Sequence, residues 1–537
     1  MVFSSAPFIF IFLPVVFLAY SILPGLKAKN AVLTMASLLF YAYGEPLFAL
    51  VMVGSVAMNY VFARLIAGRK KAPAEAAGPE AADAENGGSP DGKARTGFQK
   101  AVLFLAVVAN LGMIGVFKYA AFFVETVNDL LETNYPVPEI ALPIGISFFT
   151  FQALSYVIDV YRDPETVQKN FGKVLLYISF FPQLIAGPIV KYHDIAPYLS
   201  ERHMDIDEIA GGIQRFVTGL AKKMFLANSM GFVADTMFGL PESDMSRATA
   251  LMGAICYTLQ IYFDFSGYSD MAIGIGHMFG FTIKENFDHP YASHSIKMFW
   301  RRWHISLSTW FKEYLYIPLG GSRKGLPRTE LNKFIVFFCT GLWHGANWTF
   351  VLWGMIHGAA ITVEDILGGI WRGITGKGKR ARAADAAGAA AAGSDAPAEQ
   401  AAEEPEQPKG NPIARAAKFS VLSVLHFFGW IYTIAIVILA FVFFRADTLS
   451  GGVTMIREIF TGGAGSIASY NTVMEMLSPY NIFLFALALF VCLPHPFLTK
   501  WLRECGIVSY LITIVLFGLC VLEIAGAGFN PFIYFRF

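Results

Sequence analysis

The sequence predicts an all-α, polytopic integral membrane protein. Of its 537 residues, 55% are hydrophobic and 15% are charged, whereas about a quarter of the residues in soluble proteins are charged. The mean hydropathy is +0.51. A soluble protein of this length could not cover so much apolar surface with so few charges. The formal net charge of +1 provides no basic face, so no nucleic-acid partner is expected.

Long apolar runs recur along the whole chain, and we expect them to form one membrane domain over residues 1–537. A bilayer core about 30 Å thick requires roughly 20 apolar residues per helix, and on that basis the runs predict roughly 10 to 13 membrane passages. Several runs are too short or too polar to span alone, which favours re-entrant segments. The runs lie at 7–23, 31–43, 47–66, 101–124, 140–160, 174–190, 213–232, 248–263, 271–281, 334–370, 419–444, 482–493 and 507–524.

The distribution of basic residues predicts the orientation of the first helices. Lys27 and Lys29 follow the first apolar run, and a second basic cluster occupies 69–71. Because lysine and arginine favour cytoplasmic loops, both clusters lie inside if the N-terminus is outside and 44–46 is an outer turn. The first run has neither a basic segment before it nor a small-residue cleavage site after it, which indicates an anchored helix and not a signal peptide.

Two segments interrupt the membrane pattern. Residues 71–96 and 376–412 are rich in Ala, Gly, Pro and Glu and lack apolar periodicity. Such segments bury too little apolar surface to offset the entropy cost of ordering. We expect two disordered cytoplasmic loops that act as solvated linkers, with a regulatory role as the alternative.

Two acidic residues, Asp264 and Asp270, lie in a segment flanked by apolar runs. An aspartate at a helix centre in the membrane costs at least about 2.5–3.5 kcal/mol, so such residues usually face a cavity or a partner. They either support the site chemistry or cap broken half-helices. Together with His344 they would also fit the ion path of a secondary transporter, although we find no internal repeat of the kind from which many transporters are built.

A cationic, tryptophan-containing stretch follows at 299–312. Arg301, Arg302, Trp303 and Lys312 form an amphipathic face that suits a helix at the membrane interface. Such a face could also bind the phosphates of a nucleotide-bearing donor. The alternative is that these residues are ordinary interfacial anchors.

His344 is the candidate catalytic residue. It lies between apolar runs, and Gly341 and Gly345 leave space beside it for a reactant. An imidazole in this setting loses hydration, which favours its neutral form, and a neutral imidazole can act as a general base towards a hydroxyl. Asn347 is a nearby polar support. His304, on the cationic stretch, would by itself more often be a structural histidine.

No metal site is predicted, because the remaining histidines lack metal-ligand spacing. The five cysteines contain no C-x-x-C pair and lie in or beside apolar stretches, which favours buried thiols over disulfides or ligands. They are Cys256, Cys339, Cys492, Cys505 and Cys520.

Five ordered blocks resemble the membrane-bound O-acyltransferase superfamily. They lie at 142–152, 181–189, 264–270, 300–308 and 342–345, with a weaker likeness in the tail at 530–535. Within the superfamily the chain is similar to the bacterial branch that acetylates alginate and peptidoglycan. The membrane subunit of teichoic acid D-alanyl transfer is a more distant likeness.

The resemblance implies a ring of helices around a central funnel, with His344 as the catalytic histidine and His304 as the second motif histidine. It implies acetyl-CoA as the donor substrate, with no permanently bound cofactor. The acetyl group would cross the bacterial inner membrane to an exported polysaccharide, directly or through a periplasmic acetyltransferase. The alternatives are D-alanyl transfer of the teichoic acid type, or the secondary transporter described above.

Overall fold

The computed structural model describes residues 1–68, 95–374, 412–463, 465–526 and 532, and these residues form helices and loops without a strand. The helices of the first third are α1 (Leu13–Ile22), α2 (Leu26–Ala42), α3 (Pro46–Gly68), α4 (Gly97–Ile114), α5 (Ala120–Leu131), α6 (Ile146–Arg162) and α7 (Phe171–Ser179). The middle of the chain forms α8 (Phe181–Leu184), α9 (Tyr192–Ile195), α10 (Ile206–Ala221), α11 (Asn228–Phe238), α12 (Arg247–Met278), α13 (Ile296–Arg302), α14 (Ile305–Phe311) and α15 (Leu326–His344). The remainder forms α16 (Trp348–Ile374), α18 (Pro412–Arg445), α19 (Leu449–Thr461), α20 (Ile467–Met476), α21 (Pro479–Cys492), α22 (Pro496–Glu504) and α23 (Gly506–Gly526).

Short π-helical and 3₁₀ segments join or extend several of these helices. The π segments are η1 (Phe8–Phe12), η2 (Gly115–Tyr119), η5 (Lys222–Ala227) and η8 (Lys312–Tyr316), and the 3₁₀ segments are η3 (Pro164–Thr166), η4 (Pro197–Leu199), η6 (Glu242–Asp244) and η7 (Pro290–Ala292). Single π turns inside helices often lie at functional sites. Here η2 joins α4 to α5, and η5 joins α10 to α11.

Within the described residues, five helices are long and apolar enough to cross a membrane, and the bent pair α20–α21 would make a sixth. The five cover 46–68, 97–131, 348–370, 423–445 and 506–526. The protein is therefore a multi-pass membrane protein. Other apolar runs form shorter helices: the run at 174–190, for example, is divided between α7 and α8.

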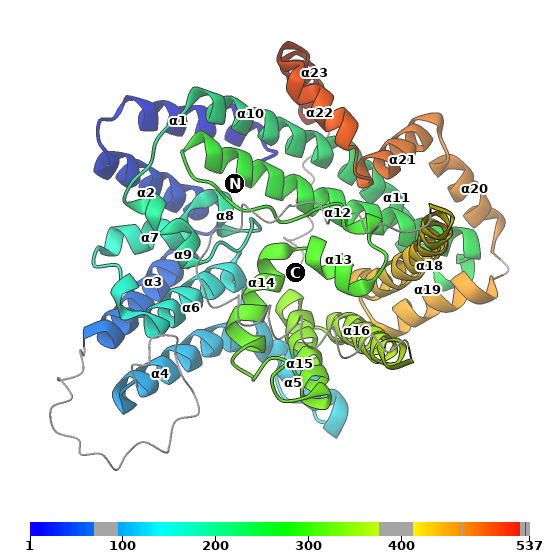
Figure 1. The fold of residues 1–537 in the computed structure, drawn as a ribbon, viewed down its shortest axis with the longest axis horizontal. Helices are drawn as coiled ribbons and strands as arrows, with labels where there is room; N and C mark the ends of the chain where they lie inside the picture. The colour runs from blue at the N-terminus through cyan, green and yellow to red at the C-terminus, as the bar shows by residue number, and fades with distance from the viewer. Residues whose placement is uncertain (69–94, 375–411, 464, 527–531, 533–537) are drawn as a thin grey trace.

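The interior helices differ from the outer ones in which faces they bury. Nearly every side chain of α6 between Ile146 and Val160 is buried, whereas only 6% of the hydrophobic window of α23 is. A helix that is apolar all round and covered by neighbours belongs to the protein interior. In Figure 1 the short helices α13 and α14 lie centrally, and the longer helices surround them.

Both predicted loops lie outside the described residues, except at their C-terminal ends. There the structure differs from the expectation of disorder. Thr96 caps α4, since its side chain accepts a hydrogen bond from the backbone of Gln99, and α18 begins at Pro412. Proline is favoured in the first turn of a helix and threonine at the cap, so both ends follow ordinary helix-start chemistry.

Candidate active site

His344 is the last residue of α15 and is buried. Its ring lies among aromatic side chains from three helices, with centroid distances of 4.9 Å to Trp343, 5.0 Å to Trp353 and 5.1 Å to Phe444. The ring of His304 is 6.4 Å away. The structure thus brings together the two histidines that are 40 positions apart in the sequence, in an environment that excludes water.

His304 lies between α13 and α14 and is fully buried. Its backbone has a φ of 45°, the left-handed region that non-glycine residues seldom adopt. The ring packs edge-on against Phe265 of α12, with centroids 4.6 Å apart, and Nδ1 lies 3.2 Å from the side-chain oxygen of Asn286. Such strain persists only where neighbouring contacts hold it, and it is frequent at functional sites.

The small residues beside His344 have a different use from the one expected. A side chain at Gly341 would collide with the backbone of Phe350, and one at Gly345 would collide with the Phe350 ring. The space is therefore filled by α16, and the expectation that these glycines leave room for a reactant is wrong. They allow α15 and α16 to pack closely at the end that carries His344.

Two residues that the sequence analysis missed hold the C-terminal end of α15. Lys118 of η2 donates from Nζ to the carbonyl oxygens of Trp343 (2.6 Å) and His344 (3.1 Å). The Tyr119 hydroxyl donates to the carbonyl of Leu342. A helix leaves its last carbonyls unsatisfied, and a cation there also complements the helix dipole. The available signal was a lone lysine within the apolar run at 101–124.

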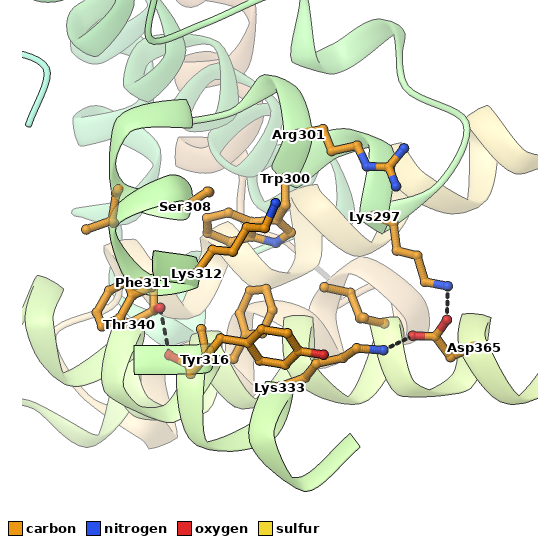
Figure 2. Close-up of a pocket in the computed structure, with 14 residues that line it drawn as sticks. Lys297, Trp300, Arg301, Ser308, Phe311, Lys312, Tyr316, Lys333, Thr340 and Asp365 are labelled. Carbon is orange, nitrogen blue, oxygen red and sulfur yellow. Dashed lines mark hydrogen bonds and ion pairs between the residues drawn. The ribbon is translucent and has the colours of Figure 1, made fainter. Parts of the chain in front are cut away.

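A cavity of about 450 Å³ opens beside the central helices. Its walls come from α13, α14, η8, α15 and α16, and they combine cations with aromatic and small polar side chains (Figure 2). The lining includes Lys297, Trp300, Arg301, Ser308, Lys312, Lys333, Thr340 and Asp365. With four basic residues and one acid named in this lining, the cavity favours an anionic ligand.

The residues of the predicted cationic face lie in two different environments. Arg301 and Lys312 line the cavity, and Figure 2 draws them without a bond to the other residues shown. Arg302 instead lies 3.9 Å from the Asp288 carboxylate, and Trp303 is buried in an aromatic cluster. The tryptophan of the cavity wall is Trp300.

Two further lysines of the cavity were also missed. Lys297 and Lys333 both form ion pairs with the carboxylate of Asp365 (Figure 2). They come from α13 and α15, whereas Asp365 comes from α16. Nothing in the local sequence indicates that these three segments meet.

Aromatic side chains connect the cavity with His344. The ring centroid of Trp300 is 5.7 Å from that of Trp353, which in turn packs against His344. His357 fits beside both tryptophans. The indole nitrogens of Trp300 and Trp353 and the hydroxyl of Ser308 are buried and have no hydrogen-bond partner among the described residues. Buried polar atoms are nearly always satisfied in folded proteins, and Trp300 and Ser308 belong to the cavity lining.

Asp264 and Asp270 are buried in ion pairs. Lys223 contacts Asp264 at 2.5 Å, while Lys222 and Arg215 each contact Asp270 at 2.6 Å. Helix α12 continues through both positions, so the idea that they cap broken half-helices is wrong. Their neutralising partners stabilise buried carboxylates inside a membrane protein.

Asn347 is engaged at the start of α16. Its side-chain oxygen accepts from the backbone of Thr349 at 3.0 Å, and its nitrogen donates to the carbonyl of Asp447 at 3.1 Å. These contacts hold the Asn347 side chain between the start of α16 and the segment at Asp447. No group of three or more potential metal ligands occurs within the part of the chain that the structure describes.

In this multi-pass helical protein, two tryptophans lie between a cation-lined cavity and a buried pair of histidines. Residues 115–386 match the family model of the membrane-bound O-acyltransferase family. The chain belongs to this family, and its activity class is O-acyl transfer.

Relatives were found among bacterial acetylating proteins. A probable alginate O-acetylase of Pseudomonas aeruginosa is 42% identical over 68% of this chain and 66% of that protein. The corresponding Pseudomonas putida protein is 32% identical over the full length of both chains. A peptidoglycan O-acetyltransferase of Helicobacter pylori is 37% identical over 68% of this chain and 70% of that protein.

Proposed function

We propose that the protein transfers an acetyl group from cytoplasmic acetyl-CoA, across the bacterial inner membrane, to an exported polysaccharide of the alginate or peptidoglycan kind. The acceptor hydroxyl belongs either to the polymer or to a periplasmic acetyltransferase that passes the group on. The observation that carries this proposal is the cation-lined cavity connected through Trp300 and Trp353 to His344. The named relatives support acetyl as the acyl group.

The cavity suits the chemistry of a coenzyme A thioester. Arg301 and Lys312, which pair with no carboxylate in the described structure, would bind the phosphates through charge-assisted hydrogen bonds. Lys297 and Lys333 are already paired with Asp365, and Lys333 also with Glu330, so among the described residues of the lining Arg301 and Lys312 supply the unpaired positive charge. The hydroxyl of Ser308 and the indole N–H of Trp300 would then satisfy amide groups of the donor arm.

In the proposed reaction, His344 takes the proton from the acceptor hydroxyl as its oxygen attacks the thioester carbonyl carbon. The tetrahedral intermediate collapses, the carbon–sulfur bond breaks, and the thiolate receives the proton from the imidazolium. The products are an O-acetyl ester and free coenzyme A. The indole N–H of Trp353 is a buried donor beside His344, placed to stabilise the negative charge on the carbonyl oxygen.

The proposal is tested with purified full-length protein in sealed proteoliposomes, with radiolabelled acetyl-CoA on one side and the acceptor on the other. We expect labelled acceptor only when the donor faces the side that carries Lys312. Candidate acceptors are acetyl-free alginate, peptidoglycan fragments and a purified periplasmic acetyltransferase, each in a separate reaction.

Two outcomes would replace the proposal with an alternative. Transfer from a D-alanyl-loaded carrier, with none from acetyl-CoA, would indicate the teichoic acid type of reaction. Ion-driven uptake of a solute without group transfer would indicate a transporter. The matched control is the Arg302→Ala variant, which removes a neighbouring cation outside the cavity and should transfer acetyl groups normally.

A further inference from the structure

Asn286 is a fully buried residue that links three separate segments of the chain. Its side-chain oxygen Oδ1 accepts hydrogen bonds from the backbone N–H of Ser306 at 3.1 Å and from the Ser306 hydroxyl at 2.8 Å. Its nitrogen Nδ2 donates to the hydroxyl of Ser269 on α12 at 3.2 Å. The same Oδ1 lies 3.2 Å from Nδ1 of His304.

These contacts determine which end of the amide is which. A backbone N–H can only donate, so the atom of Asn286 that faces the Ser306 backbone must be the oxygen. An amide oxygen can only accept, so His304 Nδ1 must carry a proton to bond to it. The Ser306 hydroxyl also lies 3.4 Å from Nδ1, but its shorter contact, 2.8 Å, is with Oδ1 of Asn286, which leaves Nδ1 to act as a donor. The orientation of the amide and the tautomer of the histidine are assignments made from the bonding pattern: the backbone donor decides the amide, and these contact lengths decide the histidine.

A neutral imidazole with its proton on Nδ1 has a lone pair on Nε2. In His304, Nε2 is buried and has no hydrogen-bond partner in the part of the chain that the structure describes, and the ring lies 6.4 Å from that of His344. In this tautomer Nε2 can accept a hydrogen bond, and it cannot donate one to an oxyanion.

We propose that Asn286 is a positioning residue that holds His304 in the Nδ1–H tautomer, so that His304 acts at the reaction centre as a hydrogen-bond acceptor. The His344 ring N–H is the donor that this lone pair would orient, which leaves the other ring nitrogen of His344 to take the proton of the acceptor hydroxyl. The catalytic consequence rests on the function proposed above, whereas the tautomer itself does not. In this role His304 orients the base and does not stabilise the oxyanion.

Further contacts hold the ring in this orientation. The Asn286 carbonyl accepts from the backbone of Ile305 at 3.0 Å, which helps to fix the left-handed backbone of His304. The Ser306 hydroxyl accepts from the backbone of Ile189 at 3.0 Å, so the network reaches the block at 181–189. An amide also carries no charge that would favour a protonated imidazole, which suits a residue that must keep a lone pair.

The tautomer can be measured without any assay of activity. Full-length protein labelled with ¹⁵N-histidine in detergent gives long-range ¹H–¹⁵N spectra that distinguish the two neutral tautomers, and the His304→Gln variant identifies the His304 signals among the 10 histidines. We expect a protonated Nδ1 and an unprotonated Nε2 at neutral pH. A proton on Nε2, alone or together with one on Nδ1, would overturn the proposal.

Kinetics of matched variants test the catalytic consequence. Asn286→Leu removes the acceptor, and we expect kcat to fall by at least about tenfold, as part of the 10²–10⁴-fold contribution of positioned proton transfer, with little change in KM for the donor. Asn286→Gln keeps an uncharged amide oxygen for Nδ1 and should retain clearly more activity. Ser269→Ala removes only the partner of the nitrogen end and should keep kcat within about threefold, as expected for one neutral hydrogen bond.

Equal activity of folded Asn286→Leu and Asn286→Gln would show that only packing matters at this position, and it would refute the positioning role. If Asn286→Leu does not fold, the His304 spectra of Asn286→Gln and Ser306→Ala decide the matter. Ser306→Ala keeps the contact between Asn286 Oδ1 and His304 Nδ1, so it should keep the Nδ1–H signal, and loss of that signal would refute the role. Absence of acetyl transfer by the unchanged protein would reject the proposed function, while the spectra would still decide the tautomer.

Discussion

Substitution of His344 can distinguish a loss of catalysis from a loss of stability. Its ring contacts Trp343, Trp353 and Phe444, so truncation leaves an aromatic wall that needs no polar partner. We expect His344→Ala to fold and insert but to lose about 10²–10⁴-fold in transfer rate, the usual contribution of a positioned base. The measurement is the rate per mole of folded protein.

Retention of more than about a tenth of the rate would mean that His344 is not the base, and the role would pass to His304. A structural histidine would instead show a fall in melting temperature together with the fall in activity. His357→Phe is the matched control, because it replaces another fully buried histidine that packs beside Trp300 and Trp353. That variant should keep its activity if the loss in His344→Ala is chemical.

The contact between η2 and the C-terminal end of α15 can be tested by substitution of Lys118, whose hydrogen bonds fix the position of His344. Lys118→Met keeps the apolar stem but removes the bonds to the Trp343 and His344 carbonyls. Hydrogen bonds to charged groups contribute roughly 1.5–3 kcal/mol, so we expect a lower melting temperature and a lower kcat.

Lys118→Arg should restore part of both quantities, since it supplies a cation and several donors. Tyr119→Phe breaks only the bond to Leu342, and its effect should be smaller, about 1 kcal/mol. Unchanged kcat in folded Lys118→Met would mean that the end of α15 holds its position without this lysine.

The cavity between α13, η8 and α15 gives a prediction about donor affinity. Arg301→Ala and Lys312→Ala should each raise the KM for acetyl-CoA by about three- to tenfold, an effect that grows weaker at high salt because exposed charges are screened. The kcat should change little, since neither residue lies at His344. Arg302→Ala, which removes the cation next to Asp288, should leave KM unchanged.

If Arg301→Ala, Lys312→Ala and Arg302→Ala raise KM equally, the increase is caused by the lower positive charge of the surface in general and not by the loss of contacts in the cavity. If none does, the donor phosphates bind elsewhere.

For the whole molecule, the positive-inside bias predicts that the cavity opens to the cytoplasm. A cysteine introduced at the exposed position of Lys324 should not react with an impermeant reagent added to intact cells, whereas a cysteine at the exposed Tyr43, next to the expected outer turn, should react. The five native cysteines are replaced first. Labelling of Lys324→Cys from outside would show that the protein has the opposite orientation, with the cavity on the acceptor side.

The fold class could be predicted from the sequence because hydrophobic composition and run length are local properties. Which runs would become interior helices was not predicted, although α6 carries Gln152 and Asp159 among its apolar residues and α23 is more uniformly apolar. Burial by neighbours is a tertiary property, and helix periodicity carries little information about it in a membrane protein.

Residues of the site were predictable where they were unusual in their own segment. His344 and the cations Arg301 and Lys312 stood out against apolar surroundings, whereas Lys297 and Lys333 acquire their meaning only through Asp365 of another helix. The same limit applies to Asp264 and Asp270, whose partners come from α10 and η5. Contacts between distant segments depend on tertiary packing, and they cannot be predicted from local patterns in a single sequence.

Helix α15 sets the distance between part of the cavity wall and His344. Its residues Lys333 and Thr340 line the cavity, and the helix ends at His344. From Lys333 to His344 the helix rises about 16 Å, at about 1.5 Å per residue. In the proposed reaction, a span of this length would require a donor whose thioester is carried on a flexible arm long enough to cover it. Acetyl thioesters of short thiols should therefore be poor donors even at concentrations that fill the cavity, a result that a comparison with acetyl-CoA at saturation would measure.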